Sequence, residues 1–192
     1  TAKPLMFMSG HKDDIRKLAY LPGGERIVTT SFDNTIRIWN VENGEQEGRT
    51  MEHKGWVNGL AVTRDGKRIL SGGYDKRISV WDSVDLTAKP LMFMSGHKDD
   101  IRKLAYLPGG ERIVTTSFDN TIRIWNVENG EQEGRTMEHK GWVNGLAVTR
   151  DGKRILSGGY DKRISVWDVE THKLIEEWQN DTGFIWCIAV SP

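Results

Sequence analysis

The sequence predicts an all-β fold, a β-propeller array with four four-stranded blades in each chain. The first observation is an internal repeat: residues 1–82 recur without one change at 87–168, and a fixed repeat period decides the architecture of a chain. The second is the spacing of four tryptophans, which are 42, 44 and 42 residues apart, within the roughly 40–45 residues of a four-stranded propeller blade. They are Trp39, Trp81, Trp125 and Trp167.

The repeat also predicts the domain organisation. Residues 1–82 and 87–168 are each expected to form a two-blade unit, and residues 83–86 to form the junction between them. Residues 169–192 form a tail that starts a fifth unit and supplies an outer strand plus one extra inner strand. Perfect identity over 82 residues, followed by a dissimilar tail, indicates either an engineered chain or a very recent duplication.

Strand signals fill each unit. Runs of β-branched and aromatic residues favour strands, and clusters of Pro, Gly, Asn and Asp separate them as turns. The i, i+3, i+5 spacing of Ile15, Leu18 and Tyr20 predicts a β-bulge in the innermost strand, because one extra residue breaks strict alternation. We expect eighteen strands, near 4–9, 15–21, 26–31 and 35–40, in the same order thereafter, with two last ones at 173–178 and 184–190.

Composition argues against several classes of protein. Lys+Arg and Asp+Glu both count 27, and without a basic excess we expect no nucleic-acid partner. No run of about 18 apolar residues occurs, so we expect no membrane span. Cys187 is the only cysteine, which excludes an intramolecular disulfide and indicates a reducing compartment. A natural chain of this kind is therefore expected to be cytoplasmic or otherwise intracellular.

Four residue types recur in register in each of the four complete units. The spacing from His to Asp is 22 residues and that from Asp to Trp is 6 in every unit. A Ser or Thr lies between the His and the Asp. The four quartets are His11, Thr29, Asp33 and Trp39; His53, Ser71, Asp75 and Trp81; His97, Thr115, Asp119 and Trp125; and His139, Ser157, Asp161 and Trp167.

Together with the dipeptides Gly10-His11 and Trp81-Asp82, the quartets resemble the WD-repeat (tryptophan–aspartate repeat) family over nearly the whole chain. The resemblance implies a ring of four-stranded blades around a channel, and non-catalytic scaffolding of protein complexes. It also implies that each quartet is a buried hydrogen-bond chain from Trp through Ser or Thr to His and Asp. Asn40 and Asn126 replace the Asp of the signature dipeptide, and the tail has Asp181 where a His is expected, so the fifth unit lacks a quartet.

A catalytic interpretation competes with this one, because His, Ser or Thr, and Asp are also the parts of a catalytic triad. Four equivalent copies favour architecture, since an enzyme needs one site, and we therefore expect no enzyme and no catalytic residues. We also expect no cofactor and no metal. His172 is the only histidine outside the quartets and Cys187 stands alone, so no zinc-ligand set can be assembled.

The resemblance further implies that one rim of the ring binds peptides or proteins. Rim positions follow from the quartets, three and five residues after each His and one before each Asp. They are rich in Trp, Tyr and Arg, which dominate binding energy at interfaces; the alternative is that Trp56 and Trp142 pack between blades. The candidate rim residues are Asp14, Arg16, Phe32, Trp56, Asn58, Tyr74, Asp100, Arg102, Phe118, Trp142, Asn144, Tyr160, Phe184 and Trp186.

The array must also close, because isolated blades leave unpaired edges and half-buried faces. Propellers typically have about four to eight blades, and WD-type blades suit the larger rings. We therefore predict a homodimer that forms one eight-bladed ring, with strand exchange between chains as a low-cost route. Residues 4–21 and 173–192 both supply an outer and an inner strand, so they either compete for one position or build an irregular ninth blade.

The predicted function is non-catalytic self-assembly into a closed ring, as expected of an engineered or recently duplicated array. The alternative is a natural interaction scaffold that binds peptides on its aromatic rim.

Overall fold

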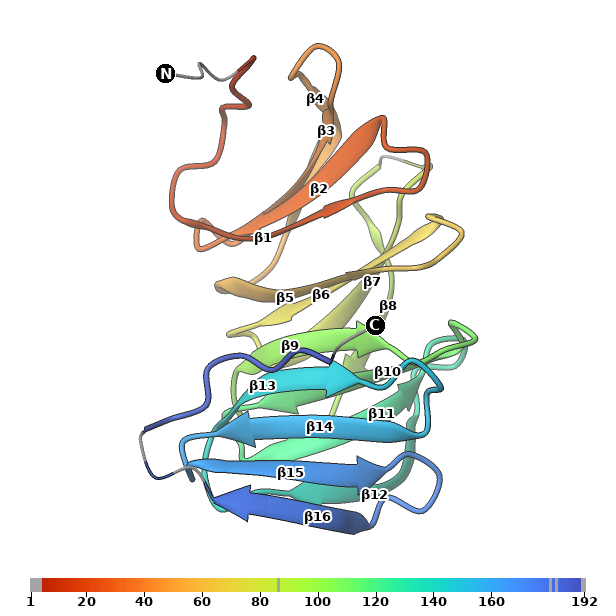
Figure 1. The fold of residues 1–192 in the computed structure, drawn as a ribbon. Coiled ribbons are helices and arrows are strands. Elements are labelled where there is room, and N and C mark those ends of the chain that lie inside the picture. The colour runs from red at the N-terminus through yellow and green to blue at the C-terminus, as the bar shows by residue number, and fades with distance from the viewer. Residues whose placement is uncertain (1–4, 86, 180, 182, 191–192) are drawn as a thin grey trace.

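The computed structural model describes residues 5–85, 87–179, 181 and 183–190. Its strands form four separate four-stranded antiparallel sheets, each built from four consecutive strands, which confirms the all-β fold and the four blades. Figure 1 shows the blades following one another along an arc. The described residues contain no helix that is long and apolar enough to cross a membrane. Leu86 of the expected junction lies outside the described residues.

Each blade is a meander in which every strand pairs with the next one along the chain. Blade 1 contains β1 (Ile15–Tyr20), β2 (Arg26–Ser31), β3 (Thr35–Asn40) and β4 (Gln46–Glu52). Blade 2 contains β5 (Val57–Val62), β6 (Arg68–Gly73), β7 (Arg77–Asp82) and β8 (Pro90–Ser95). Blade 3 contains β9 (Ile101–Tyr106), β10 (Arg112–Ser117), β11 (Thr121–Asn126) and β12 (Gln132–Glu138). Blade 4 contains β13 (Val143–Val148), β14 (Arg154–Gly159), β15 (Arg163–Asp168) and β16 (Leu174–Gln179).

The expectation of eighteen strands is wrong by two. Residues 5–9 and 184–190 are not strands, and Pro4, the first residue of the expected 4–9 strand, lies outside the described residues. A strand needs a hydrogen-bonding partner, and neither segment joins any of the four sheets. The outer position on blade 4 is filled by β16, which pairs with β15, and the inner position on blade 1 is filled by β1, which pairs with β2.

The innermost strands carry the predicted bulge. The pairing register between β1 and β2 shifts between Ile15 and Lys17, and the pairings of β5 with β6, β9 with β10 and β13 with β14 shift at the equivalent residues. One extra residue increases the local twist of a strand. The residues at the four bulges line one common cavity; they are Arg16, Asn58, Arg102 and Asn144.

Three hydrophobic clusters fill the three seams between successive blades. At the seam between blades 2 and 3, Leu70 of blade 2 packs with Ile101 and Leu104 of blade 3. The blades approach closely because Gly59 and Gly72 have no side chain: a Cβ on Gly72 would lie 3.0 Å from Ile101 Cγ2, and one on Gly59 would overlap Leu104. Blades 1, 2 and 3 thus each bury an apolar face on the next blade.

Candidate functional site

The structure brings the members of each predicted quartet together. In blade 1, His11 Nδ1 lies 2.9 Å from Asp33 Oδ2 and His11 Nε2 lies 2.7 Å from Thr29 Oγ1, while Trp39 Nε1 lies 2.8 Å from the same hydroxyl. The corresponding distances in the other three blades are 2.8–2.9, 2.7 and 2.7–2.8 Å. The histidine precedes the first strand, the hydroxyl lies on the second, the aspartate lies in the turn and the tryptophan lies on the third. Each quartet therefore ties two strands to one turn and to the segment that precedes the first strand.

One order of protons satisfies every group in the chain. In blade 3 the Trp125 indole N–H donates to Thr115 Oγ1, so the Thr115 hydroxyl proton is donated to His97 Nε2. The remaining His97 Nδ1–H then donates to Asp119 Oδ2. This direction needs a neutral imidazole, and burial lowers the pKa of His97 in agreement with it. A fully connected buried network rigidifies the fold around it.

The aspartates are held as carboxylates. Burial alone would raise the pKa of Asp119, but hydrogen bonds from His97, from the Thr121 hydroxyl and from the backbone N–H of Lys98 keep it well below its usual range. In blade 1 the balance is the same, with burial opposed by Thr35, Lys12 and His11 hydrogen bonds, and the pKa of Asp33 is lowered. The carboxylate is therefore the acceptor at which the hydrogen-bond chain ends.

Sequence reasoning missed two further members of this network. Thr35 Oγ1 lies 2.6 Å from Asp33 Oδ1, and Thr121 Oγ1 lies 2.5 Å from Asp119 Oδ1. The signal that could have found them is a Thr two residues after the Asp, which occurs in blades 1 and 3 and is replaced by Arg77 in blade 2 and by Arg163 in blade 4.

The quartets have the distances of a Ser–His–Asp triad but not its accessibility. Ser71, Thr115 and Ser157 are fully buried and Thr29 is nearly so. A nucleophilic hydroxyl must reach a substrate, whereas these oxygens already accept from an indole and donate to an imidazole. Within the described part of the chain, no group of three or more His, Cys, Asp or Glu side chains is arranged to hold a metal ion.

The predicted rim contains a continuous aromatic stack in blades 3 and 4. The ring centroids of Phe118 and Trp142 are 4.6 Å apart, those of Trp142 and Tyr160 are 4.9 Å apart, and Tyr160 stacks on Phe184 of the tail at 4.2 Å. Trp186 meets the edge of Tyr160 at 5.6 Å. The chain thus contributes aromatic rings to this surface from two blades and from the tail.

The first copy repeats the arrangement in blades 1 and 2. Trp56 lies 4.7 Å from Phe32 and 5.8 Å from Tyr74, and the Arg16 guanidinium lies 4.4 Å from the Phe32 ring. The matching Arg102 lies 4.3 Å from Phe118. Trp56 and Trp142 remain 48% and 44% exposed, so each lies at a seam between blades and still offers half of its surface to solvent.

Three predicted rim residues do not face solvent. Asn58, Asn144 and Asp100 are only 4%, 2% and 7% exposed, so they offer little surface to a large partner on the rim. The first two lie at the bulge of an innermost strand and line a cavity that all four innermost strands share. Asp14 has the same sequence environment as Asp100 but is exposed, because no described blade precedes it.

The repeat structure and the quartets agree with a comparison against protein families. The family described as "WD domain, G-beta repeat" matches at residues 2–40, 45–82, 88–126 and 131–168. The chain belongs to the WD-repeat family. Each matched range covers one His-to-Trp unit, so the WD repeat and the structural blade are offset by one strand, as the outer strand of each blade opens the next matched range.

Curated WD-repeat relatives are similar over about one repeat. The U3 small nucleolar RNA-associated protein 13 of Saccharomyces cerevisiae is 43% identical over 44 residues, 23% of this chain and 5% of that protein. Ribosome assembly protein 4 of the same yeast is 38% identical over 45 residues, 23% and 9% of the two chains. Periodic tryptophan protein 2, also from this yeast, is 40% identical over 40 residues, 21% and 4%. The similarity thus spans less than a tenth of each of these relatives.

Proposed function

We propose that this WD-repeat chain is a non-catalytic scaffold that completes its ring by joining a second copy into eight blades. The observation that carries the proposal is that one sequence is buried at β9 and uncovered at β1. Ile101 and Leu104 are 0% and 8% exposed, whereas the identical Ile15 and Leu18 are 52% and 62% exposed. An apolar face that is core in one copy and bare in the other is a contact surface for a blade that would precede β1.

The matching surface lies at the other end of the chain, on the inner strands of blade 4. Gly145 and Gly158 there correspond to Gly59 and Gly72 of blade 2, which receive Leu104 and Ile101 at the seam between blades 2 and 3. In this chain the tail covers that surface: Ile188 lies against Gly145 and Ile185 against Gly158. The tail therefore occupies the position at which a strand of a second copy would pack.

The N-terminal segment likewise occupies a position at which an outer strand of a second copy would pack. Met92 of β8 lies against the Gly130 turn of blade 3, with its sulfur 3.2 Å from where a Cβ on Gly130 would lie. Met6, from the identical sequence at the N-terminus, lies in the same way 3.0 Å from the corresponding point on Gly44. The tail thus covers the contact surface of blade 4, and the N-terminal segment covers the Gly44 turn of blade 1 while the β1 face stays exposed. We infer that a second copy displaces both segments when the ring closes.

We expect the chain without substitutions, called the parent below, to have the mass of two chains in light scattering at micromolar concentration. Ile15→Asp/Leu18→Asp should reduce this to the mass of one chain, because two carboxylates on the β1 face cannot be buried against a partner. Ile185→Asp/Ile188→Asp should keep or increase the dimer, because it loosens only the tail that competes with the partner.

The matched control is Leu91→Asp/Phe93→Asp, which changes two apolar residues of similar exposure (56% and 53%) on the outer strand β8. It should leave the dimer intact. A single-chain mass for the parent contradicts ring closure by two copies. Loss of the dimer on loosening the tail contradicts an eight-bladed ring and favours an irregular ninth blade that uses the tail.

A second candidate function is peptide docking on the aromatic rim, supported by the stacked and half-exposed rings described above. Aromatic and Arg side chains at the centre of a surface provide most of the binding energy at protein interfaces.

Fully buried quartet hydroxyls support a scaffold rather than an enzyme. An intracellular location and an origin by engineering or recent duplication are part of the same proposal, and the 82-residue identity supports the latter.

For the rim, we expect peptides selected from a random library on the parent chain to bind Trp56→Ala/Trp142→Ala at least tenfold more weakly, about 1.4 kcal/mol. The control is Trp178→Ala, which removes a tryptophan of similar exposure (49%) on β16 and should change the affinity less than twofold. Affinity would be measured by fluorescence polarisation of labelled peptides. Unchanged affinity for the double variant contradicts rim docking.

A further inference from the structure

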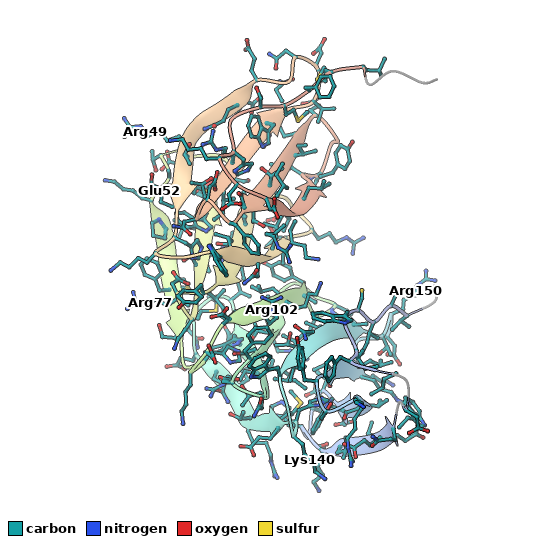
Figure 2. All side chains as sticks on the ribbon, turned by 90° about the vertical axis from the view of Figure 1, so that its left-hand side faces the viewer. Arg49, Glu52, Arg77, Arg102, Lys140 and Arg150 are labelled. Carbon is teal, nitrogen blue, oxygen red and sulfur yellow. The ribbon has the colours of Figure 1, made fainter. Side chains whose placement is uncertain are left out.

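A cavity of about 150 Å³ lies where the innermost strands of all four blades meet the tail. One water molecule needs only ~10–15 Å³ of such volume, so the space admits a small polyatomic ligand. Its walls come from β1, β5, β9 and β13, with Trp186 of the tail on one side. Figure 2 labels Arg102, one of the lining residues, near the middle of the arc.

The cavity is strongly cationic. Arg16 and Lys17 of β1 and Arg102 and Lys103 of β9 line it, and none of the described lining residues carries a carboxylate. Burial, together with the neighbouring Lys17 ammonium, lowers the pKa of Lys103 to about 8. Four like charges around one small cavity repel each other, and an anion among them would relieve that repulsion.

Carboxylates near the cavity do not cancel this charge. Asp100 is the nearest to Arg102 in sequence, and burial, followed by the neighbouring Asp99, raises its pKa. The counterpart of Asp100 in the first copy, Asp14, is exposed, and the Asp14 backbone N–H donates to the Asp13 carboxylate. None of these carboxylates belongs to a residue that lines the cavity, whereas four cations do, so the charge on the cavity wall is positive.

Two buried amides add neutral hydrogen-bonding groups to the cationic wall. Asn58 is 4% exposed, and neither its Oδ1 nor its Nδ2 has a hydrogen-bond partner among the described residues. In the second copy, Asn144 Oδ1 accepts from Arg102 Nε at 3.3 Å, but Asn144 Nδ2 has no partner there either. Leaving such buried donors unsatisfied is unfavourable. Both unpartnered N–H₂ groups belong to residues that line the cavity.

We propose that this cavity binds a small multivalent oxyanion such as pyrophosphate. Arg16 and Arg102 present guanidinium N–H groups that match paired phosphate oxygens. Lys17 and Lys103 supply point charges, and the Asn58 and Asn144 amides donate the remaining hydrogen bonds. The anion cross-links β1 of blade 1 to β9 of blade 3, and it therefore stabilises the curvature of the array. All of its proposed ligands lie on innermost strands, so they remain in place when a second copy displaces the tail and its Trp186.

The test is isothermal titration calorimetry of sodium pyrophosphate into the full-length chain at pH 7 and low salt. Lys17→Gln/Lys103→Gln should weaken binding at least tenfold. The control, Lys67→Gln/Lys153→Gln, removes the same charge from two exposed turn lysines and should change the affinity less than twofold. No binding by the parent at millimolar pyrophosphate overturns the proposal, and so does equal weakening in both variants, which would mean attraction by overall charge alone.

Thermal unfolding provides a second readout that does not depend on heat of binding. Pyrophosphate should raise the Tm of the parent by several degrees, because a ligand that binds only the folded state stabilises it. Without ligand, Lys17→Gln/Lys103→Gln should melt no lower than the parent, since it removes two repelling ammonium groups. With the same concentration of ligand, its Tm should rise less than that of the parent. An equal rise in Tm for this variant and the parent would overturn the assignment of these lysines to the site.

Discussion

Asp119→Ala is expected to destabilise the chain by about 4 kcal/mol, through the loss of one acceptor that serves four donors. The His97 Nδ1–H, the backbone N–H groups of Lys98 and Thr121 and the Thr121 hydroxyl all donate to this carboxylate, at 2.9, 2.8, 2.9 and 2.5 Å. His97 and Thr121 are 7% and 9% exposed, so water replaces few of these bonds. Each buried donor left unpaired costs about 1–3 kcal/mol.

Urea unfolding followed by circular dichroism would measure this loss. The matched control is Asp151→Ala, which removes an exposed turn carboxylate that accepts from Lys153 N–H and the Thr149 hydroxyl. That change should cost about 1 kcal/mol or less, since solvent replaces the lost acceptor. Similar losses for Asp119→Ala and Asp151→Ala would mean that the quartet contributes no more than a surface turn.

Gly73→Ala is expected to cost about 3 kcal/mol, because a methyl group at this position meets rigid backbone. A Cβ on Gly73 would overlap the Trp56 carbonyl oxygen and lie 3.0 Å from Val57 Cα. The same carbonyl accepts from Tyr74 N–H at 2.9 Å, so β5 and β6 cannot separate without losing that bond. Overpacking of this kind typically costs about 1–3 kcal/mol, and more where the backbone must move.

Gly23→Ala separates this steric effect from the general cost of replacing a glycine. Gly23 has φ +96°, and a Cβ there would have no atom within 4 Å. The substitution therefore costs only backbone strain, about 1 kcal/mol. Both variants would be compared by urea unfolding. Equal losses would show that the close approach of Gly73 to Trp56 does not limit the packing of blade 2.

Much of the fold could be predicted from the sequence because the blade period, the turns and the bulge are local properties. The absence of strands at residues 5–9 and 184–190 could not be predicted from the sequence, and a comparison of two segments with the same sequence shows why. Residues 90–95 form β8, whereas residues 5–9, which repeat the last five of these residues, form no strand. Strand formation depends on a pairing partner, and the partner differs while the sequence does not.

The sequence likewise predicted some features of the candidate site and not others. Residue spacing identified all sixteen quartet positions, since a His, a hydroxyl, an Asp and a Trp must recur together to form one hydrogen-bond chain. Counting along the chain also located the aromatic stack. It could not predict that Asn58, Asn144 and Asp100 are buried, because exposure is set by the blades on either side. Asp14 and Asp100 have the same neighbours in sequence and different neighbours in space.

The seam between blades 2 and 3 has a consequence for assembly beyond a single ring. Its two surfaces differ from each other, one offering glycines and the other offering Ile101 and Leu104, so contacts of this type between chains are head-to-tail. Head-to-tail contacts produce a closed ring when the rotation between neighbours divides the circle, and an open filament when it does not. The number of chains in an assembly is therefore governed by the angle between blades, and small changes in packing at the glycines would select rings of different size or fibres.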